Sequence, residues 1–233
     1  MSKTTQVNNE RAVFNLEERR SKKDVVYEFI RKEIVENRLK PGQFLVERKL
    51  CEWLNSSRTP IREALKELSE RGLVTTAAGR GASVATIKFE DIVEIYDIRA
   101  ALEGLAVELC TQNIAPNQIQ EMERKHDNFG KALKAKNFDM TLEVDIEFHM
   151  FILEIAANTR LTNLLRNMYD QVKRITNLIK GDEIRTKVAI EQHKNVLAAI
   201  KDGKGEQARR LMEYHVRDSK EHHLQNCLKH KYE

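Results

Sequence analysis

The distribution of proline is the feature that most constrains the fold of this chain. Its 233 residues include only three prolines, at positions 41, 60 and 116, so the second half has none. Proline removes a backbone donor and breaks regular helices, and long stretches without it allow helices of many turns. Apolar residues recur in this half at the spacing that places them on one helix face. The sequence therefore predicts a helical C-terminal part.

Six helices are expected in this part, and no alternating strand pattern interrupts them. Short breaks rich in asparagine, glycine or aspartate separate them, as in connections between antiparallel neighbours. The predicted fold class is mainly α, with an antiparallel bundle of about six helices at the C-terminal end. The expected helices are 89–112, 117–136, 138–157, 160–180, 184–202 and 204–228.

The N-terminal part has a different order of elements. Three short helical runs are expected near 22–37, 46–54 and 58–71. β-prone segments follow on both sides of Gly79-Arg80-Gly81, which indicates a small β-hairpin. Three helices and then a hairpin are the elements of a winged helix-turn-helix.

Charge is divided unevenly between the two parts. The formal net charge is +4, but residues 1–88 hold 18 Lys/Arg and 12 Asp/Glu, whereas residues 89–233 hold 22 and 24. A basic part joined to a slightly acidic part indicates that one end meets a polyanion. We expect a mobile polar tail at 1–20, a winged helix-turn-helix at 21–88 and a helical domain at 89–233.

Composition argues against several other classes of protein. Charged residues make up 33% of the chain, and no stretch approaches the roughly 20 apolar residues that span a bilayer, so no membrane partner is expected. The first ten residues lack the apolar segment of a secretory signal. The three cysteines are far apart in sequence, which argues against a disulfide scaffold or thiolate zinc cluster and favours a reducing, cytoplasmic location.

The segment that begins at Asn55 carries the clearest functional pattern. Asn55 suits a left-handed turn, Ser57 suits a helix cap, and Pro60 falls in the first helical turn, where its missing N–H is not needed. Arg58 and Arg62 lie one turn apart on the outer face, where guanidinium groups can reach phosphates and base edges. Each arginine alone is compatible with a solvated helix face, but the ordered set favours DNA binding.

This segment closely resembles the DNA-binding domain of GntR-type bacterial transcription regulators. The resemblance covers residues 30–86 and rests on Ser57-Arg58-Thr59-Pro60-Ile61-Arg62-Glu63-Ala64-Leu65, on Arg71-Gly72-Leu73-Val74 and on the glycine-flanked Arg80. Asn55-Ser56 departs from the Gly-Val that is usual in the family.

The resemblance implies which residues contact DNA. By the family's pattern they are Arg48, Ser57, Arg58, Thr59, Arg62 and Gly79. Arg80, at the hairpin tip, could also reach a neighbouring minor groove or phosphate.

Three of the seven histidines lie on apolar faces of the expected bundle helices. Asp145 and His149 are four residues apart and converge on one face, and His193 and His215 lie on the last two helices. Since an unpaired imidazole or carboxylate is costly to bury, the four side chains could form a site for a divalent first-row metal. Spacing alone also allows hydrogen-bonded core histidines and a structural Asp145–His149 pair.

The other histidines fit such a site less well. His222 shares a face with His215 but is seven residues on, about 10 Å along the axis, so one ion cannot take both. His126, His223 and His230 are expected to be exposed.

Residues 89–233 resemble the FCD domain, the effector-binding bundle of the FadR-like branch of GntR regulators. The likeness rests on the run from Tyr96 to Glu103, on Asp145-x-x-x-His149, on Glu191-Gln192-His193 and on Tyr214-His215. It implies Asp145, His149, His193 and His215 as ligands of zinc, nickel or manganese.

A small organic acid is the effector that this resemblance implies. It would bind beside or on the metal, with help from the arginine of the first bundle helix, here Arg99. Arg99 could equally form a simple ion pair with Glu103, four residues on.

The sequence predicts a transcription regulator and not an enzyme. We expect a homodimeric repressor that binds a near-palindromic operator in double-stranded DNA. Two alternatives stay open. The metal could be purely structural, or the protein could be a metal-dependent hydrolase in which the ion activates water. The hydrolase leaves the N-terminal part unexplained, and no general base is evident from the spacing.

Overall fold

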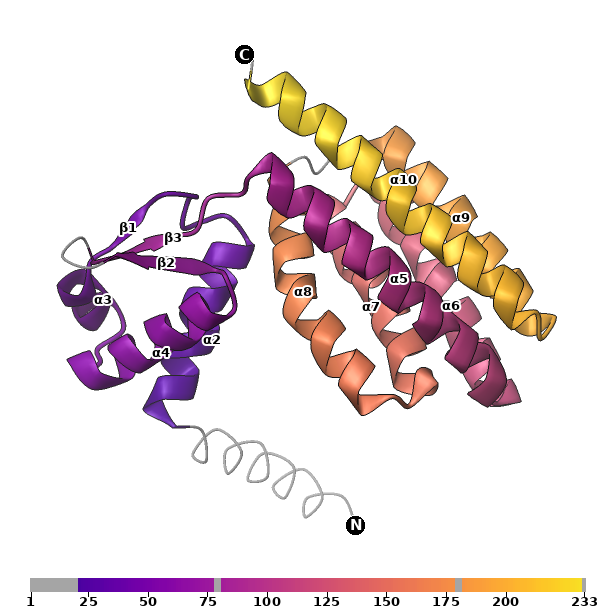
Figure 1. Cartoon of the computed structure of the whole chain (residues 1–233), viewed down its shortest axis with the longest axis horizontal. Helices are drawn as coiled ribbons and strands as arrows, with labels where there is room; N and C mark the ends of the chain where they lie inside the picture. The colour runs from indigo at the N-terminus through magenta and orange to yellow at the C-terminus, as the bar shows by residue number, and fades with distance from the viewer. Residues whose placement is uncertain (1–20, 78–80, 179–181, 232–233) are drawn as a thin grey trace, which may run out of the picture. The chain divides into compact units, whose positions relative to one another are not determined.

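The computed structural model describes residues 21–77, 81–178 and 182–231 of the chain (Figure 1). It divides into two compact units, with the break between Thr86 and Ile87. The expected tail at 1–20 and the hairpin-tip residues Gly79 and Arg80 lie outside the described residues. Across the described ranges, no helix is long and apolar enough to cross a membrane.

The N-terminal unit is a winged helix-turn-helix, as predicted. Its small antiparallel sheet has the order β1-β3-β2, and Ser83 on β3 pairs with Phe44 on one side and Thr75 on the other. The two-residue strand β1 was not predicted, because so short a segment shows no alternation. The elements are α2 (Lys22–Val35), β1 (Phe44–Leu45), α3 (Glu47–Trp53), α4 (Arg58–Glu70), β2 (Val74–Ala77) and β3 (Gly81–Val84).

The local sequence explains where α4 begins and which of its faces is buried. Asn55 has a φ of 44°, the left-handed conformation predicted for the turn before this helix. Ser57 is the N-cap residue, although its side chain makes no capping hydrogen bond. The face of α4 that packs on the core is fully apolar, and the opposite face is left to solvent. The buried residues of α4 are Ile61, Ala64, Leu65 and Leu68.

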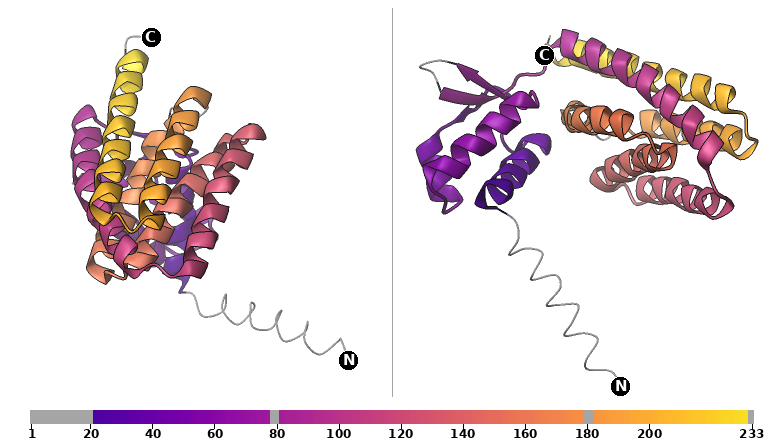
Figure 2. Two further views of the ribbon diagram at one scale, coloured as in Figure 1. Left: turned by 90° about the vertical axis from the view of Figure 1, so that its right-hand side faces the viewer. Right: turned by 60° about the horizontal axis from the view of Figure 1, so that its bottom comes forward.

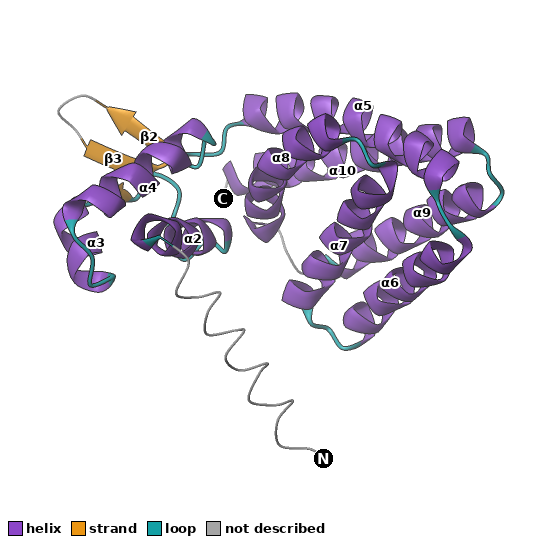
Figure 3. Ribbon diagram, turned by 90° about the horizontal axis from the view of Figure 1, so that it is seen from below, coloured by secondary structure: helices purple, strands orange, loops and turns teal. Residues whose placement is uncertain are grey.

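The C-terminal unit is a bundle in which all six predicted helices are present (Figure 2). Their boundaries differ by a few residues from the expected ones. In space, α5 packs against α10 and also against α7 and α8 (Figure 3). The helices are α5 (Phe89–Asn113), α6 (Pro116–Lys134), α7 (Phe138–Ala156), α8 (Thr159–Leu178), α9 (Glu183–Lys201) and α10 (Gly205–Lys231).

Capping residues fix the starts of the helices that carry the candidate site. The side chain of Asn137 accepts a hydrogen bond from the backbone N–H of Met140 at 3.0 Å and caps α7. Asp182 accepts one from the backbone N–H of Arg185 at 2.8 Å and caps α9. Ala157, with a φ of 54°, ends α7 in the left-handed conformation. These residues set where α7 begins and ends and where α9 begins.

Candidate metal centre and DNA-reading helix

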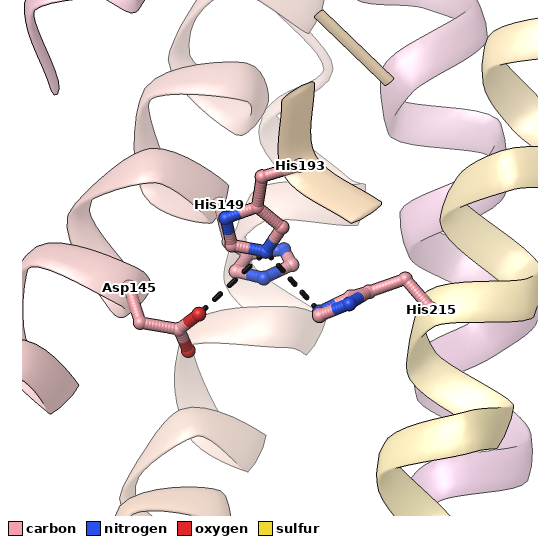
Figure 4. Close-up of side chains that lie close together, drawn as sticks. All are labelled: Asp145, His149, His193 and His215. Carbon is pink, nitrogen blue, oxygen red and sulfur yellow. Dashed lines mark hydrogen bonds and ion pairs between the residues drawn. The ribbon is translucent and has the colours of Figure 1, made fainter. Parts of the chain in front are cut away.

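The structure brings together all four residues that the sequence proposed as metal ligands (Figure 4). Asp145 and His149 come from α7, His193 from α9 and His215 from α10. One donor atom from each lies within 4.8 Å of all the others. The three histidines are buried and Asp145 is half-buried, so the cluster is largely shielded from water.

The distances within the cluster fit a single small cation. His193 Nε2 lies 3.2 Å from His215 Nε2 and 3.6 Å from Asp145 Oδ1. Two ligands of one tetrahedral zinc ion, each about 2.1 Å from it, would be roughly 3.4 Å apart. Three imidazoles with one carboxylate are a donor set that suits zinc and other divalent first-row metals.

Hydrogen bonding within the protein leaves some of these atoms unsatisfied. His149 Nε2 and His193 Nδ1 are buried and have no hydrogen-bond partner among the described residues. A buried polar atom left without a partner costs about 1–3 kcal/mol. A metal bound at His149 Nε2 would remove one of these costs. These orphaned atoms are therefore a reason, independent of spacing, to regard the cluster as a ligand set.

Burial also sets the protonation states that a metal requires. Desolvation lowers the pKa of His193 and of His215 well below the usual value, so both rings are neutral and carry a free lone pair. Desolvation raises the pKa of Asp145, and nearby positive groups only partly oppose it. A cation in the cluster would offset the charge of this carboxylate.

The orientation of His215 is fixed by a neighbour on α9. Its Nδ1 lies 2.8 Å from the side-chain oxygen of Gln192, which can only accept, so the ring hydrogen sits on Nδ1. The Nε2 lone pair is then free to face the cluster. His222, the rival considered from the sequence, instead lies with Nε2 3.5 Å from Asp182 Oδ2.

A cavity of about 100 Å³ adjoins the cluster. It is bordered by two of the candidate ligands, by two arginines and by several hydroxyl groups, so it could accept a small polar anion. The polar residues of its lining are Tyr96, Arg99, Thr141, Asp145, Thr176, Asp182, Arg185, Thr186, His215, Ser219, His222 and His223.

The structure shows the ion pair expected of Arg99 and also places Arg99 at the cavity. Its Nε donates to Glu103 Oε1, so the simple ion pair exists. Its guanidinium carbon also lies 5.3 Å from the ring centre of Tyr96 and 5.4 Å from that of Tyr169. Arg99 nevertheless lines the cavity, although only 4% of it is exposed.

The expectation that His223 is exposed was wrong. His223 is buried and lines the cavity, because it lies eight residues after His215 and so shares the inner face of α10. Its Nδ1 lies 2.5 Å from the carbonyl oxygen of Ser219, which can only accept, so the ring hydrogen is on Nδ1. Nε2 then accepts from the hydroxyl of Thr176 at 3.3 Å.

His126 and His230 were also expected to be exposed. His126 is half-buried rather than exposed, since its Nε2 lies 3.0 Å from the carbonyl oxygen of Ile190 on α9. The side chain of His230 lies outside the described residues.

The residues proposed for DNA contact surround the start of α4. Ser57, Arg58, Thr59 and Arg62 are all exposed there, and Arg48 is exposed on α3. Arg62 Nε donates to both oxygens of Glu47, at 3.0 and 2.9 Å, which ties α4 to the start of α3. Arg48 lies 3.8 Å from Glu52. Gly79 and Arg80 cannot be placed, because they fall outside the described residues.

Sequence reasoning missed Glu103 as a part of the site. Glu103 Oε2 lies 2.6 Å from His149 Nδ1, across the packing of α5 against α7. Glu103 ends the run from Tyr96 that resembles the first helix of the FCD domain. From the sequence it was expected only to form an ion pair with Arg99. Nothing in the spacing relates residues so far apart in the sequence.

A winged helix-turn-helix followed by a helical bundle with a cluster of candidate metal ligands is typical of one class, the DNA-binding regulators that carry a separate sensing domain. Comparison with family models specifies it further. Residues 22–84 match the bacterial regulatory proteins of the gntR family, and residues 94–218 match the FCD domain. The chain belongs to the GntR family and carries an FCD domain; it is a DNA-binding transcription regulator.

Individual relatives agree with this family membership. An uncharacterized HTH-type transcriptional regulator of Bacillus subtilis, YdhC, is 30% identical over 84% of this chain and 88% of its own. The HTH-type transcriptional repressor RspR of Escherichia coli is 26% identical over 84% and 86%. Because the family and these relatives are transcription regulators and not enzymes, the hydrolase alternative is not supported.

Solved structures agree on the fold. E. coli McbR/YncC superposes with a TM-score of 0.76 at 22% identity, over 89% of this chain and 99% of its own. A putative GntR regulator from Rhodococcus sp. RHA1 gives a TM-score of 0.74 at 22% identity, over 88% and 98%. At this level of identity the likeness concerns the fold alone.

Proposed function

We propose that this protein is a homodimeric repressor whose binding to a near-palindromic operator is controlled by a small organic acid. The acid binds in the cavity of the bundle, beside a divalent metal held by Asp145, His149, His193 and His215. Binding there favours one arrangement of the paired DNA-reading units over another, so that both half-sites no longer fit together.

The observation that carries this proposal is the ligand set on the cavity wall. Asp145 and His215 belong both to the cluster and to the cavity lining, so a molecule in the cavity reaches the metal site directly. A bound divalent ion would supply positive charge and open coordination positions for a carboxylate. Zinc, nickel or manganese would suit these donors.

Two arginines border the cavity and could receive the acid. Arg99 uses Nε for Glu103, and its terminal nitrogens, which make no hydrogen bond within the described residues, could receive a carboxylate. Arg185 lies at the start of α9, where it donates to Ser219 and lies 3.0 Å from Asp218. Arginine binds planar carboxylates with two parallel hydrogen bonds, which favours an organic acid over a neutral ligand.

The proposed DNA contacts are those implied by the family pattern. Arg58 and Arg62, exposed at the start of α4, would enter the major groove, and Ser57, Thr59 and Arg48 would contact the backbone. Gly79 and Arg80, which follow β2 in the sequence, remain proposed contacts. The ion pair between Arg62 and Glu47 would hold that guanidinium in place before DNA arrives.

An apolar stripe on α5 supports dimerisation. Ile98, Leu102, Leu105 and Leu109 repeat at spacings of four and three, and Ile98 and Leu105 are 53% and 37% exposed. On the neighbouring α8, Leu164 is 57% exposed. Leu102 and Leu109 are half-buried against the core, whereas the exposed Ile98 and Leu105 fit contact with a second copy of the same surface.

Repression is the direction of control that we propose. RspR and a D-xylose utilization regulator of Paenarthrobacter nicotinovorans are named as repressors, although the E. coli Glc operon regulator is named as an activator.

Elemental analysis of the purified protein, combined with native mass spectrometry, tests the metal and the dimer together. We expect one divalent first-row ion per chain and the mass of a dimer. A metal-free protein would refute the metal centre, and a monomer at micromolar concentration would refute the dimer.

A further inference from the structure

Glu103 is a buried carboxylate whose two oxygens serve different partners. Oε1 accepts from Arg99 Nε and, at 2.9 Å, from the hydroxyl of Tyr169. Oε2 faces the other way and lies 2.6 Å from His149 Nδ1. Only 2% of Glu103 is exposed, so these three neighbours take the place of water around the carboxylate.

The charge state of Glu103 follows from these contacts. Glu103 forms a buried ion pair with Arg99 and accepts a hydrogen bond from the hydroxyl of Tyr169, and both contacts favour the ionised carboxylate. An ionised carboxylate only accepts hydrogen bonds, so the hydrogen between Glu103 and His149 belongs to His149 Nδ1.

This assignment fixes the state of the His149 ring. A His149 ring with its single hydrogen on Nδ1 carries its lone pair on Nε2, which is buried and has no hydrogen-bond partner among the described residues. His149 Nδ1 and Glu103 Oε2 are in contact at 2.6 Å, but their geometry falls short of a hydrogen bond. A metal at Nε2 would complete a chain from carboxylate through imidazole to cation.

We propose that Glu103 is a positioning residue for the metal, one that holds His149 with its Nε2 lone pair available to the ion. The inference rests on the proposed metal centre. Arg99 has a second role in this arrangement, because its charge compensates that of Glu103 and makes a buried carboxylate tolerable at this place.

A purely structural ion pair would not need this geometry. Arg99 and Tyr169 both use Oε1, so their contacts with Glu103 would survive if Oε2 had no partner. Because Oε2 faces His149, the negative charge of Glu103 lies beside the cluster of candidate ligands. From the sequence, Glu103 was expected only to pair with Arg99, four residues earlier.

The test compares two double variants in which neither buried charge is left alone. Arg99→Met with Glu103→Met removes both charges and the acceptor for His149. Arg99→Met with Glu103→Gln removes both charges but keeps an oxygen that can accept from Nδ1. Tyr169→Phe is the matched control, because it removes one hydrogen bond to the same carboxylate at the oxygen that does not face His149.

Zinc affinity is measured by competition with a chromogenic chelator, and the visible spectrum of bound Co²⁺ reports the coordination geometry. Circular dichroism confirms that each variant is folded. We expect the Met variant to bind zinc on the order of 10- to 100-fold more weakly than wild type and to alter the Co²⁺ spectrum. The Gln variant should recover part of this loss, and Tyr169→Phe should stay close to wild type.

Wild-type zinc affinity and an unchanged Co²⁺ spectrum in the folded Met variant would overturn the inference. So would an equal loss in Tyr169→Phe, because the effect would then come from packing around Glu103. Failure of the wild-type protein to bind zinc or Co²⁺ is a separate result, which would refute the metal centre and this inference with it.

Discussion

The Nε2 atoms of His193 and His215 lie 3.2 Å apart, although the two residues belong to different helices. His215 carries its hydrogen on Nδ1, so its Nε2 offers only a lone pair. Without a metal, His193 must carry its own hydrogen on Nε2 and donate it to His215, which leaves His193 Nδ1 as a buried acceptor without a partner among the described residues. A metal in the cluster would use both Nε2 lone pairs, and the hydrogen of His193 would then lie on Nδ1.

Replacement of His193 should therefore reduce metal binding. We expect His193→Ala to lower the metal content of the purified protein well below one ion per chain, because it removes one of four donors. His222→Ala is the control, since that ring pairs with Asp182 outside the cluster. Elemental analysis decides the matter: full metal content in His193→Ala would remove His193 from the site.

Removal of the metal should lower thermal stability. A ligand at 100 times its dissociation constant stabilises the folded state by about 2.7 kcal/mol, which corresponds to roughly 5–10 °C for a protein of this size. Chelation followed by dialysis should lower the melting temperature by this amount, and added zinc should restore it. An unchanged melting temperature after verified metal loss would show that the cluster does not hold the bundle together.

Replacement of the arginines of α4 should weaken DNA binding without unfolding the protein. Arg58→Ala and Arg62→Ala should each cost about 1–3 kcal/mol of specific binding. Both side chains are exposed, so the melting temperature should change little. Arg210→Ala on α10 is a matched control, because Arg210 is also exposed and ion-paired. Gel-shift titration that gives wild-type affinity for both variants would contradict their assigned roles.

A charge placed in the α5 stripe should break the dimer. Ile98→Glu introduces a carboxylate into the proposed interface, where burial without a partner is costly. We expect analytical ultracentrifugation to show monomers and operator affinity to fall with dimer loss. Ile184→Glu is the control, because Ile184 is 78% exposed but lies at the start of α9. A dimer that persists in Ile98→Glu would place the interface elsewhere.

The metal-free bundle should lose stability in mild acid, partly through His223. Desolvation lowers the pKa of His223 to about 3 from an ordinary 6.5, whereas the backbone hydrogen bond to Ser219 acts in the opposite direction. Below pH 6.5 the unfolded chain takes up a proton that the folded chain does not, so stability falls until about pH 3.

Between pH 6.5 and about pH 5 the loss from this one group is roughly 1–2 kcal/mol. Urea denaturation of wild type and His223→Gln at both pH values measures it. Between the two pH values, the free energy of unfolding should fall less in His223→Gln than in wild type. Equal losses in the two proteins would mean that His223 is not held neutral in the folded state.

Much of the fold could be predicted because it depends on local patterns. The apolar spacing of three and four and the lack of proline after Pro116 predict the bundle helices, since each signal lies within one helix. The left-handed Asn55 and the start of α4 followed in the same way. Strand β1 could not be found, because two residues carry no period and Phe44 and Leu45 form a strand only by pairing with β3.

In the candidate site, too, the relationships within one helix could be predicted and those between helices could not. Asp145 and His149 could be paired from their spacing on one helix, and the family resemblance linked them to His193 and His215. The contact between Glu103 and His149 depends on how α5 packs against α7, and the burial of His223 depends on what covers the inner face of α10. These are tertiary relationships, which a single sequence does not contain.

If the bundle controls DNA binding through its metal-bordered cavity, a small acid must change the affinity for DNA only when the metal site is intact, and fluorescence anisotropy measures this. A labelled duplex, selected by the protein from a random pool, is titrated with zinc-loaded wild type and with His193→Ala. Each titration is repeated with a panel of small mono-, di- and hydroxycarboxylates at constant ionic strength. We predict that at least one acid changes the DNA affinity of the wild type about tenfold and that His193→Ala does not respond. Equal responses in both proteins, or DNA binding by the metal-loaded wild type that no acid in the panel alters, would contradict control of DNA binding through this cavity.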